Sequence, residues 1–247
     1  MNISNVLISS EDADIVCFSE MKAKQEQNPC TFRGYELIWC ECTDKAGYAG
    51  TAVLSKVKPL SIIRGIGSSD GEGRALTLEY DTFYLVNTYV PNSGQNLKFK
   101  KRRLEWDEAM KKWLSDLQEK KPVIWTGDLN VAILDFDVYD GETNKSRKRT
   151  AGFTPYEREN FRTLTDELGL VDSYRHFYPK EREKHYTFFS TRGKGMKENN
   201  KGWRLDYFMV SKTLVNILED VEVKKEKAYS DHVPLVLTMK HPDIALC

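Results

Sequence analysis

The stretch Lys121-Pro-Val-Ile-Trp-Thr-Gly-Asp-Leu-Asn130 decides how the chain is interpreted. Its Pro-Val-Ile-Trp run predicts a short strand that is buried on both faces. Asp128 and Asn130 follow directly and, two positions apart in extended backbone, would share one face. In layered α/β proteins, chemistry collects just past the ends of such strands. On this stretch alone, an Asx turn at the strand exit is the commoner explanation.

Length and composition are those of a folded α/β protein. The 247 residues suit one large domain or two small ones. Hydrophobic residues make up 40% of the chain and aromatic residues 11%, which is enough for a packed core. No internal repeat and no Pro/Ser-rich linker divides the sequence, so residues 1–247 are expected to form a single domain.

Net charge gives no information about a partner, because Lys plus Arg and Asp plus Glu both number 37. The basic residues are nevertheless clustered, at Lys98–Arg103, Lys145–Arg149 and Arg192–Arg204. Charge runs are usually solvated surfaces. Because these three lie near candidate site residues, a surface that faces phosphate groups is an equally good explanation.

The cysteines are scattered, and Cys17, Cys30, Cys40, Cys42 and Cys247 form no CxxC pair. An odd, scattered set is typical of reduced thiols in an intracellular protein rather than of a disulfide framework. Cys40 and Cys42 lack the nearby Cys/His pair that would complete a zinc site. The sequence has no signal-peptide core and no apolar run long enough for a membrane span. We therefore expect a soluble intracellular protein that makes no membrane contact, in the nucleus of a eukaryote or the cytoplasm of a bacterium.

The remaining patterns predict many strands and few helices. Strands are expected at residues 14–18, 35–40, 51–55, 76–80, 83–89, 186–190, 203–210 and 235–239; helices are expected at residues 97–118, 154–168 and 214–218, with the remnant of another at residues 1–10. The clearest helix start is Thr154-Pro-Tyr-Glu157, which has a capping box with Pro at the first helical position. This mixture predicts an α/β sandwich of two packed sheets flanked by helices.

Several polar residues lie at or beside the ends of predicted strands: Glu20, Asp128, Asn130, Asp206, Asp231 and His232. Carboxylates without convergent Cys or His ligands suit a hard cation, Mg²⁺ or Mn²⁺, which can neutralise a phosphodiester. An Asp beside an orienting Asn can position and deprotonate water, and a His held by a carboxylate can donate to phosphoryl oxygens. Taken singly, the histidine is more commonly a satisfied loop residue, and the acids are turn or helix-end residues. Together they predict metal-assisted phosphodiester hydrolysis.

Short motifs occur in a fixed order along the chain: Gly47-Tyr-Ala-Gly-Thr-Ala52, Glu72-Gly-Arg74, Asn87-Thr-Tyr-Val-Pro-Asn92, Thr126-Gly-Asp-Leu-Asn130, Gly152-Phe-Thr154, Gly202-Trp-Arg-Leu-Asp-Tyr-Phe208 and Ser230-Asp-His232. This series resembles the signatures of the exonuclease III family of abasic-site (AP) endonucleases, in the endonuclease/exonuclease/phosphatase superfamily. The resemblance extends from Asp12 to Leu237, nearly the whole chain.

The resemblance implies a fold, a cofactor and a substrate. The fold is a four-layer α/β sandwich, and the cofactor is Mg²⁺, for which Mn²⁺ can substitute. The substrate is double-stranded DNA that contains abasic sites, which a monomer would incise 5′ to the missing base during base excision repair. The resemblance also implies 3′–5′ exonuclease and 3′-phosphodiesterase activity.

Catalytic roles follow from the resemblance by position. Four residues match positions at or near the metal, namely Glu20, Asp231, Asp128 and Asn130. Asp128 would also activate water, with Asn130 beside it. His232 would contact the phosphate and would be oriented by Asp206.

Substrate-binding roles follow in the same way. Tyr89 and Asn92 match residues that line and position the scissile phosphate, and Asn144 matches an amide that contacts the DNA backbone. The pocket for the flipped abasic sugar is matched by Phe188, Trp203 and Leu205. A baseless sugar is small and costs little to extrude, so such a pocket makes physical sense. Spacing alone would assign these apolar residues to the core.

The sequence departs from the family pattern at its start. The family's opening strand, which ends in a Trp-Asn-Val-Asn/Asp-Gly signature, is expected to be absent, because Met1 corresponds to the helix that follows it. Loss of that strand would leave a groove in the sheet and remove an asparagine from the site. An N-terminally truncated or misannotated start and an impaired protein are the two explanations, and we prefer the first because the other site residues are present.

Two further functions stay open beside the AP endonuclease, which is our main hypothesis. A catalytically impaired DNA-binding remnant of the same family would bind DNA in a salt-sensitive manner and would not incise it. A related phosphoesterase would act on a lipid or inositol phosphate. The apolar pocket and the basic loops argue against the second of these.

Overall fold

The computed structural model describes residues 12–27, 32–67, 71–182, 185–227 and 230–240. The helix remnant expected at residues 1–10 lies outside these ranges, as do Cys30 and Cys247. The cysteines that the structure describes, Cys17, Cys40 and Cys42, are free thiols. This agrees with the prediction that they form no disulfide framework.

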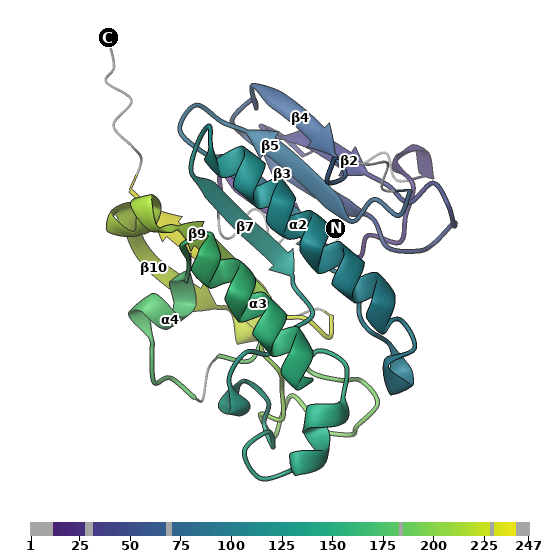
Figure 1. Ribbon diagram of the computed structural model, residues 1–247. Helices are drawn as coiled ribbons and strands as arrows, with labels where there is room; N and C mark the ends of the chain where they lie inside the picture. The colour runs from purple at the N-terminus through teal and green to yellow at the C-terminus, as the bar shows by residue number, and fades with distance from the viewer. Residues whose placement is uncertain (1–11, 28–31, 68–70, 183–184, 228–229, 241–247) are drawn as a thin grey trace.

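A six-stranded mixed sheet forms the centre of the molecule (Figure 1). Its strands, in spatial order, are β4 (Ser61–Arg64), β5 (Ala75–Glu79), β6 (Tyr84–Tyr89), β7 (Val123–Asp128), β9 (Asp206–Ser211) and β8 (Leu170–Asp172). Strands β6 and β7 are parallel, and the other neighbouring pairs are antiparallel. The stretch quoted first is therefore a central strand, and the hairpin predicted beside it is β5–β6.

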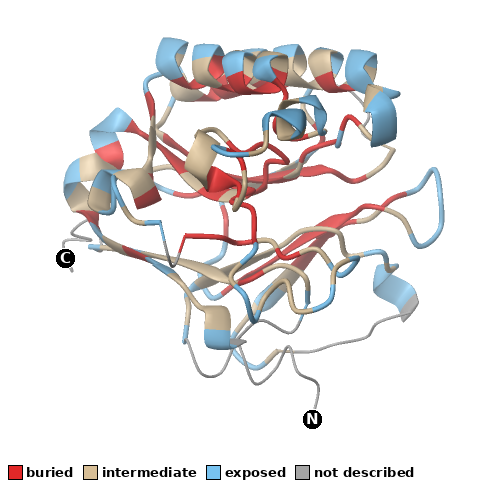
Figure 2. Cartoon of the chain, turned by 90° about the horizontal axis from the view of Figure 1, so that it is seen from below, coloured by how far each residue is buried: buried red, intermediate tan, exposed pale blue. Residues whose placement is uncertain are grey.

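Two helices, α2 (Lys100–Gln118) and α3 (Pro155–Glu167), cover one face of this sheet. Helix α2 makes the crossover that the parallel pair β6 and β7 requires. Side chains from both helices and from the strands form one core, which includes Tyr84, Val86, Met110, Leu114, Trp125, Phe161 and Leu164. Figure 2 shows helix surfaces exposed to solvent above buried strands. In the described ranges, no helix has the length and apolar character needed to cross a bilayer.

The start of α3 confirms the predicted capping box. Thr154 Oγ1 accepts a hydrogen bond from Glu157 N at 3.4 Å, and Glu157 Oε2 accepts one from Thr154 N at 3.2 Å. Glu157 is fully buried and also accepts from Ser93 Oγ and Gly152 N. Gly169 follows the helix with a φ of +59°, a conformation that favours glycine. The cap therefore joins α3 to the loops that leave β6 and β7.

A second layer of strands packs on the other face of the six-stranded sheet. It contains an antiparallel sheet in the order β1 (Ile15–Phe18), β3 (Thr51–Ser55) and β2 (Glu36–Cys40), and an antiparallel pair, β10 (Leu218–Val223) and β11 (Leu235–Met239). The residues between the layers include Ile38, Val53, Leu76, Leu78, Leu85, Ile124, Val210 and Leu218. The predicted α/β sandwich of two packed sheets flanked by helices is thus confirmed.

One predicted strand is not formed, and another begins later than predicted. Residues 186–190 form only isolated bridges, in which Phe188 pairs with Trp203 and with His232. The strand predicted at residues 203–210 is β9 and begins at Asp206. Both segments are rich in apolar residues because they pack in two small clusters, one around Trp203 and one with Val233, and not because they continue a sheet.

Short elements were missed or misassigned. The helix predicted at residues 214–218 is a 3₁₀ helix, η5 (Lys212–Ile217), and Leu218 already begins β10. Strands β4 and β8 and helix α4 (Ser173–Phe177) were not predicted, because elements this short show little periodicity. Strand β10 was not predicted either, because half of its sequence, LEDVEV, is acidic. The remaining 3₁₀ turns are η1 (Gln25–Gln27), η2 (Gln95–Leu97), η3 (Asp135–Asp137), η4 (Lys145–Arg149) and η6 (Lys225–Lys227).

Candidate active site

Three predicted site residues stand side by side at the ends of adjacent strands. Asp128, the last residue of β7, is in register with Tyr89 at the end of β6 and with Asp206 at the start of β9. Gly127 makes this register possible, because a Cβ at that position would lie 2.0 Å from the carbonyl oxygen of Thr88. Its φ of +117° is also in the region that favours glycine. The pairing of strands in the central sheet therefore brings Tyr89, Asp128 and Asp206 together.

Asn130 holds Asp128 in place. Its backbone N–H donates to Asp128 Oδ1 at 2.9 Å, and its side-chain Nδ2 donates to Asp128 Oδ2 at 3.0 Å. Nδ2 also donates to the carbonyl oxygen of Val90. Asn130 Oδ1 in turn accepts from Asn92 Nδ2 at 3.0 Å. The predicted pair of a carboxylate and an orienting amide is therefore present, and Asn92 extends it.

His232 lies between two carboxylates. Its Nδ1 is 2.8 Å from Asp206 Oδ2, and its Nε2 is 4.0 Å from Asp128 Oδ2. Thr187 Oγ1 accepts from the backbone N–H groups of Leu205 and Asp206, which fixes the start of β9. The structure thus brings together an acid and an imidazole that are 26 residues apart in sequence.

The charges in this group shift one another's pKa values. Burial raises the pKa of the Asp128 carboxyl to about 7, and the Asp206 carboxylate acts in the same direction while His232 opposes it. Burial lowers the pKa of His232, but the neighbouring carboxylates, Asp206 foremost, outweigh it and raise the value to about 10. A carboxyl group that titrates near pH 7 beside a protonated imidazole can exchange protons with a substrate and with water.

Glu20 reaches the same region from the exit of β1. Its Oε1 accepts from Tyr89 Oη at 3.0 Å and lies 2.8 Å from Lys22 Nζ. Arg74 packs over the Tyr89 ring, with its guanidinium carbon 4.6 Å from the ring centroid. Burial and the carboxylates of Glu20 and Asp128 raise the pKa of Tyr89, so its hydroxyl is a hydrogen-bond donor at neutral pH. The segment that follows β1 therefore contacts the end of β6 through the hydrogen bond between Glu20 and Tyr89.

Glu20 and Asp128 are the carboxylates best suited to a divalent cation. In the described part of the chain, no three His, Cys, Asp or Glu side chains form a ready metal-binding group. Mg²⁺ does not require one, since it keeps several waters and is often bound by one or two carboxylates plus substrate phosphate. The Glu20 side chain is 35% exposed and is therefore accessible to a cation. Its charge raises the pKa of Asp128, so the two carboxylates are close enough to interact. The Asp231 carboxylate instead lies close enough to raise the pKa of His232.

The three residues predicted for an apolar pocket pack together. Phe188, Trp203 and Leu205 form one cluster with Phe153, and the Phe153 and Trp203 rings meet edge to face at 6.0 Å. The Phe188 ring centroid is 5.0 Å from that of His232, so the cluster borders the candidate active site.

Asn144 lies apart from that group. It caps η4, accepting from Ser146 N and donating to Asp140 Oδ2. Arg147 on the same turn pairs with Asp140 and donates to Tyr139 Oη. Asn144 therefore lies on a basic loop, and its contact with the DNA backbone stays a prediction.

Two residues near the site were given no role by sequence reasoning. Arg74 had a signal, because the Glu72-Gly-Arg74 motif was noted; its Nε donates to Glu72 at 2.5 Å, and Glu72 also pairs with Arg102 of α2. Thr187 had none, since a single threonine in an apolar run carries no pattern. Its role in fixing the start of β9 is seen only in the hydrogen bonds that it accepts there.

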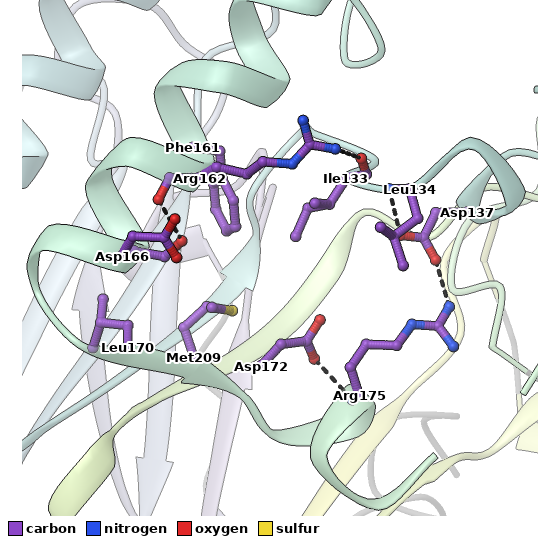
Figure 3. Close-up of a pocket in the computed structure, with 11 residues that line it drawn as sticks. Ile133, Leu134, Asp137, Phe161, Arg162, Asp166, Leu170, Asp172, Arg175 and Met209 are labelled. Atoms are coloured by element: carbon purple, nitrogen blue, oxygen red, sulfur yellow. Dashed lines mark hydrogen bonds and ion pairs between the residues drawn. The ribbon is translucent and has the colours of Figure 1, made fainter. Parts of the chain in front are cut away.

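A cavity of about 290 Å³ lies elsewhere, between α3, the loop Ile133–Asp137 and the β8–α4 segment (Figure 3). It contains none of the predicted site residues. Asp137 accepts from Arg175 Nη2 at 2.5 Å and from Leu134 N at 2.9 Å, and Asp172 accepts from Arg175 N. Because none of the predicted site residues lines it, the cavity is not the candidate active site.

Comparison with known proteins supports a single family. A model described as "Endonuclease/Exonuclease/phosphatase family" matches residues 6–232. The exodeoxyribonuclease of Bacillus subtilis (strain 168) is 41% identical over 232 residues, which cover 93% of this chain and 89% of that protein. The DNA-(apurinic or apyrimidinic site) endonuclease of Dictyostelium discoideum is 44% identical over 240 residues, 92% of this chain, and the chain spans 63% of that protein's length.

A solved structure agrees with these relatives. The crystal structure of the AP endonuclease LMAP from Leishmania major superposes with a TM-score of 0.88 at 32% sequence identity. The superposition covers 97% of this chain and 82% of the Leishmania chain. The similarity therefore includes both strand layers and the edge at which Tyr89, Asp128 and Asp206 meet.

Proposed function

The chain belongs to the Endonuclease/Exonuclease/phosphatase family, and within it to the exonuclease III group of AP endonucleases; from this premise we propose that it is a DNA repair nuclease that incises the backbone 5′ to abasic sites. The observation that carries the proposal is the row Tyr89, Asp128 and Asp206 with His232 between the two acids. Exonuclease activity at 3′ ends would use the same groups, since it breaks the same bond.

The geometry supplies the acid and base functions of phosphodiester hydrolysis. Asp128, held in place by two hydrogen bonds from Asn130, accepts a proton from water. His232, protonated because Asp206 and its other carboxylate neighbours raise its pKa to about 10, donates to the phosphoryl oxygens. Tyr89, whose hydroxyl donates to Glu20 just beyond the end of β1, would help to position the phosphate.

A divalent cation completes the charge balance. The chemistry of this family generally uses one, and we propose Mg²⁺, with Mn²⁺ as a substitute, because the available ligands are hard carboxylate oxygens. Glu20 and Asp128 would hold it. When bound, the cation supplies neutralisation of the phosphate charge and stabilisation of the departing oxygen.

We propose selectivity for abasic sites because an apolar cluster borders His232. The Phe188, Trp203 and Leu205 cluster is apolar and buried to a large extent, so it suits a deoxyribose without a base better than a nucleotide. Basic residues on the loops around it would bind the flanking phosphates and make the affinity for DNA fall with salt. We propose a monomer acting inside the cell, since one chain contains all the groups used.

The test is incision of a duplex with one abasic site, with and without Mg²⁺, by the wild-type protein and by Asp128→Asn. We expect Mg²⁺-dependent nicking by the wild type and a loss of about 10³-fold or more in the variant, because the amide cannot take the proton. Asp81→Asn, at an exposed turn, is the matched control and should nick normally. Equal nicking by Asp128→Asn, salt-sensitive binding without incision, or a preference for inositol phosphates would each reject the proposal.

A further inference from the structure

Arg103, in the first turn of α2, is one of the largest fully buried side chains of the described residues, with an exposure of 1%. It belongs to the basic run Lys98–Arg103, which as a run of charges predicts a solvated surface. Its neighbours in the run, Lys100 and Lys101, are exposed, so Arg103 is an exception that needs its own explanation.

The guanidinium group of Arg103 binds the backbone of two active-site loops. Nη1 donates to the carbonyl oxygen of Pro91 at 3.3 Å and to that of Asn130 at 3.0 Å, and Nη2 donates to that of Leu129 at 3.2 Å. Nε donates to Asp107 Oδ1 at 2.8 Å, one helical turn further along α2. One side chain on a rigid helix thus links the loop after β6 to the loop after β7.

Both loops carry side chains of the reacting centre. Asn92 follows Pro91, and its Nδ2 donates to Asn130 Oδ1. Asn130 has a φ of +50°, a left-handed conformation that is uncommon outside glycine, and in this conformation its amide reaches Asp128. The carbonyl group of Asn130 is one of the three that Arg103 binds.

We propose that Arg103 is a positioning residue for hydrolysis, which keeps Asn130 in its left-handed conformation and so keeps the amides of Asn130 and Asn92 aligned with Asp128. The planar guanidinium fork suits this role because it presents several donors in fixed directions, which the single ammonium group of lysine does not. Asp107 neutralises the buried charge and orients the fork. The inference rests on the proposed function for its effect on turnover, but its effect on Asn130 can be measured separately.

Arg158 of α3 provides a matched control. It is also largely buried, at 8% exposure, its Nε donates to the carbonyl oxygen of Ile133 at 2.7 Å, and its Nη1 pairs with Asp135. It therefore does the same kind of work as Arg103, but at Ile133, farther along the loop after β7 than Asn130, where it binds no carbonyl of Pro91, Leu129 or Asn130. Loss of either arginine should destabilise the fold, whereas only loss of Arg103 should misalign Asn130.

The experiment compares Arg103→Met, Arg103→Lys and Arg158→Met in incision of a duplex with one abasic site, below the unfolding temperature of each protein. We expect kcat to fall about 100-fold in Arg103→Met and about tenfold in Arg103→Lys, since a small misplacement of a catalytic group costs this much. KM should change little in both, and Arg158→Met should keep a near-normal kcat.

A second readout does not depend on activity. The side-chain amide resonances of Asn130, identified by their loss in Asn130→Asp, should shift in both Arg103 variants and stay in place in Arg158→Met. If Arg103→Met does not fold, Arg103→Lys carries both measurements.

Unshifted Asn130 resonances, an equal loss of kcat in the Arg103 and Arg158 variants, or a change confined to KM would overturn the role of Arg103. A wild-type protein that fails to incise would reject the proposed function instead, and the resonances would still decide whether Arg103 positions Asn130.

Discussion

Two histidine–aspartate pairs of this molecule look alike in composition and differ in almost every physical property. His232 lies 2.8 Å from Asp206 at the edge of the sheet, and His185 lies 3.9 Å from Asp137 in the interior beside the cavity of Figure 3. The pKa of His232 is raised to about 10, whereas that of His185 is lowered to about 4. The two histidines are therefore in opposite charge states at neutral pH.

The difference comes from the charges that surround each pair. Burial is the main reason for the low pKa of His185, and Asp137 cannot compensate for it, because its carboxylate already serves Arg175 and lies 3.9 Å from Arg204. At the sheet edge, His232 is the cation that balances several carboxylates.

An aspartate beside a histidine is thus not informative by itself. What matters is whether the aspartate's charge is already balanced by other cations. The interior pair has two arginines for its acid, whereas the edge pair has a second acid within 4.0 Å of the imidazole. Only in the pair of His232 and Asp206 is a charged imidazole available to a substrate.

The largest difference between the two pairs is expected when each imidazole is removed in turn. His232→Gln should lower kcat for incision about 10³-fold, because it removes the proton donor to the phosphoryl oxygens. His185→Gln should change kcat less than threefold, because that ring touches no reacting group. The measurement is single-turnover nicking of an abasic duplex, and similar losses in the two variants would show that the pairs are not functionally distinct.

The second prediction concerns the acid of the interior pair. Asp137→Asn should lower the free energy of unfolding by about 3 kcal/mol, because it leaves Arg175 and Arg204 without their shared counter-charge in a buried position. Urea unfolding of the variant and the wild type measures this. An unchanged midpoint would mean that Asp137 does not balance the arginines and that Asp172, which pairs with Arg204, is sufficient.

The smallest predicted effect is a pH dependence that separates the histidines. Because the pKa of His185 is about 4 in the folded protein against 6.5 as its ordinary value, only the unfolded chain gains a proton between pH 6.5 and pH 4. Stability should therefore fall as the pH falls through this window, by about 2 kcal/mol between pH 7 and pH 5 from this group alone. Urea unfolding of His185→Gln should show a decrease smaller by that amount, and an identical decrease would contradict the low pKa.

Much of the fold was predictable because strong local signals coincide with long elements. The apolar run before Asp128 is central strand β7, and the capping box at Thr154 starts α3. Residues 186–190 were misassigned because apolar side chains gather there around Trp203 without a sheet to pair with. Strands of three or four residues, such as β8 and β4, are set by their neighbours and have no pattern of their own.

The residues of the candidate site also fall into those that the sequence predicts and those that it does not. Asp128, Asn130, Asp206 and His232 follow strand ends or lie in motifs, so sequence alone could bring them forward, and the structure places them together. Arg103 could not be found, because a basic run does not reveal which of its members turns inward. The protonation states of the two histidines could not be predicted either, because they depend on charges from segments that are distant in the sequence.

Gly127 has a consequence for how mutational surveys of this protein would be interpreted. A methyl group at this position would collide with the carbonyl of Thr88 on the adjoining strand. An alanine scan would accordingly score Gly127 among the most sensitive positions, although it offers no functional group to a substrate. Sensitivity at this position would report the spacing of two chain segments, so a map of intolerant positions would overstate how many residues take part in bond cleavage.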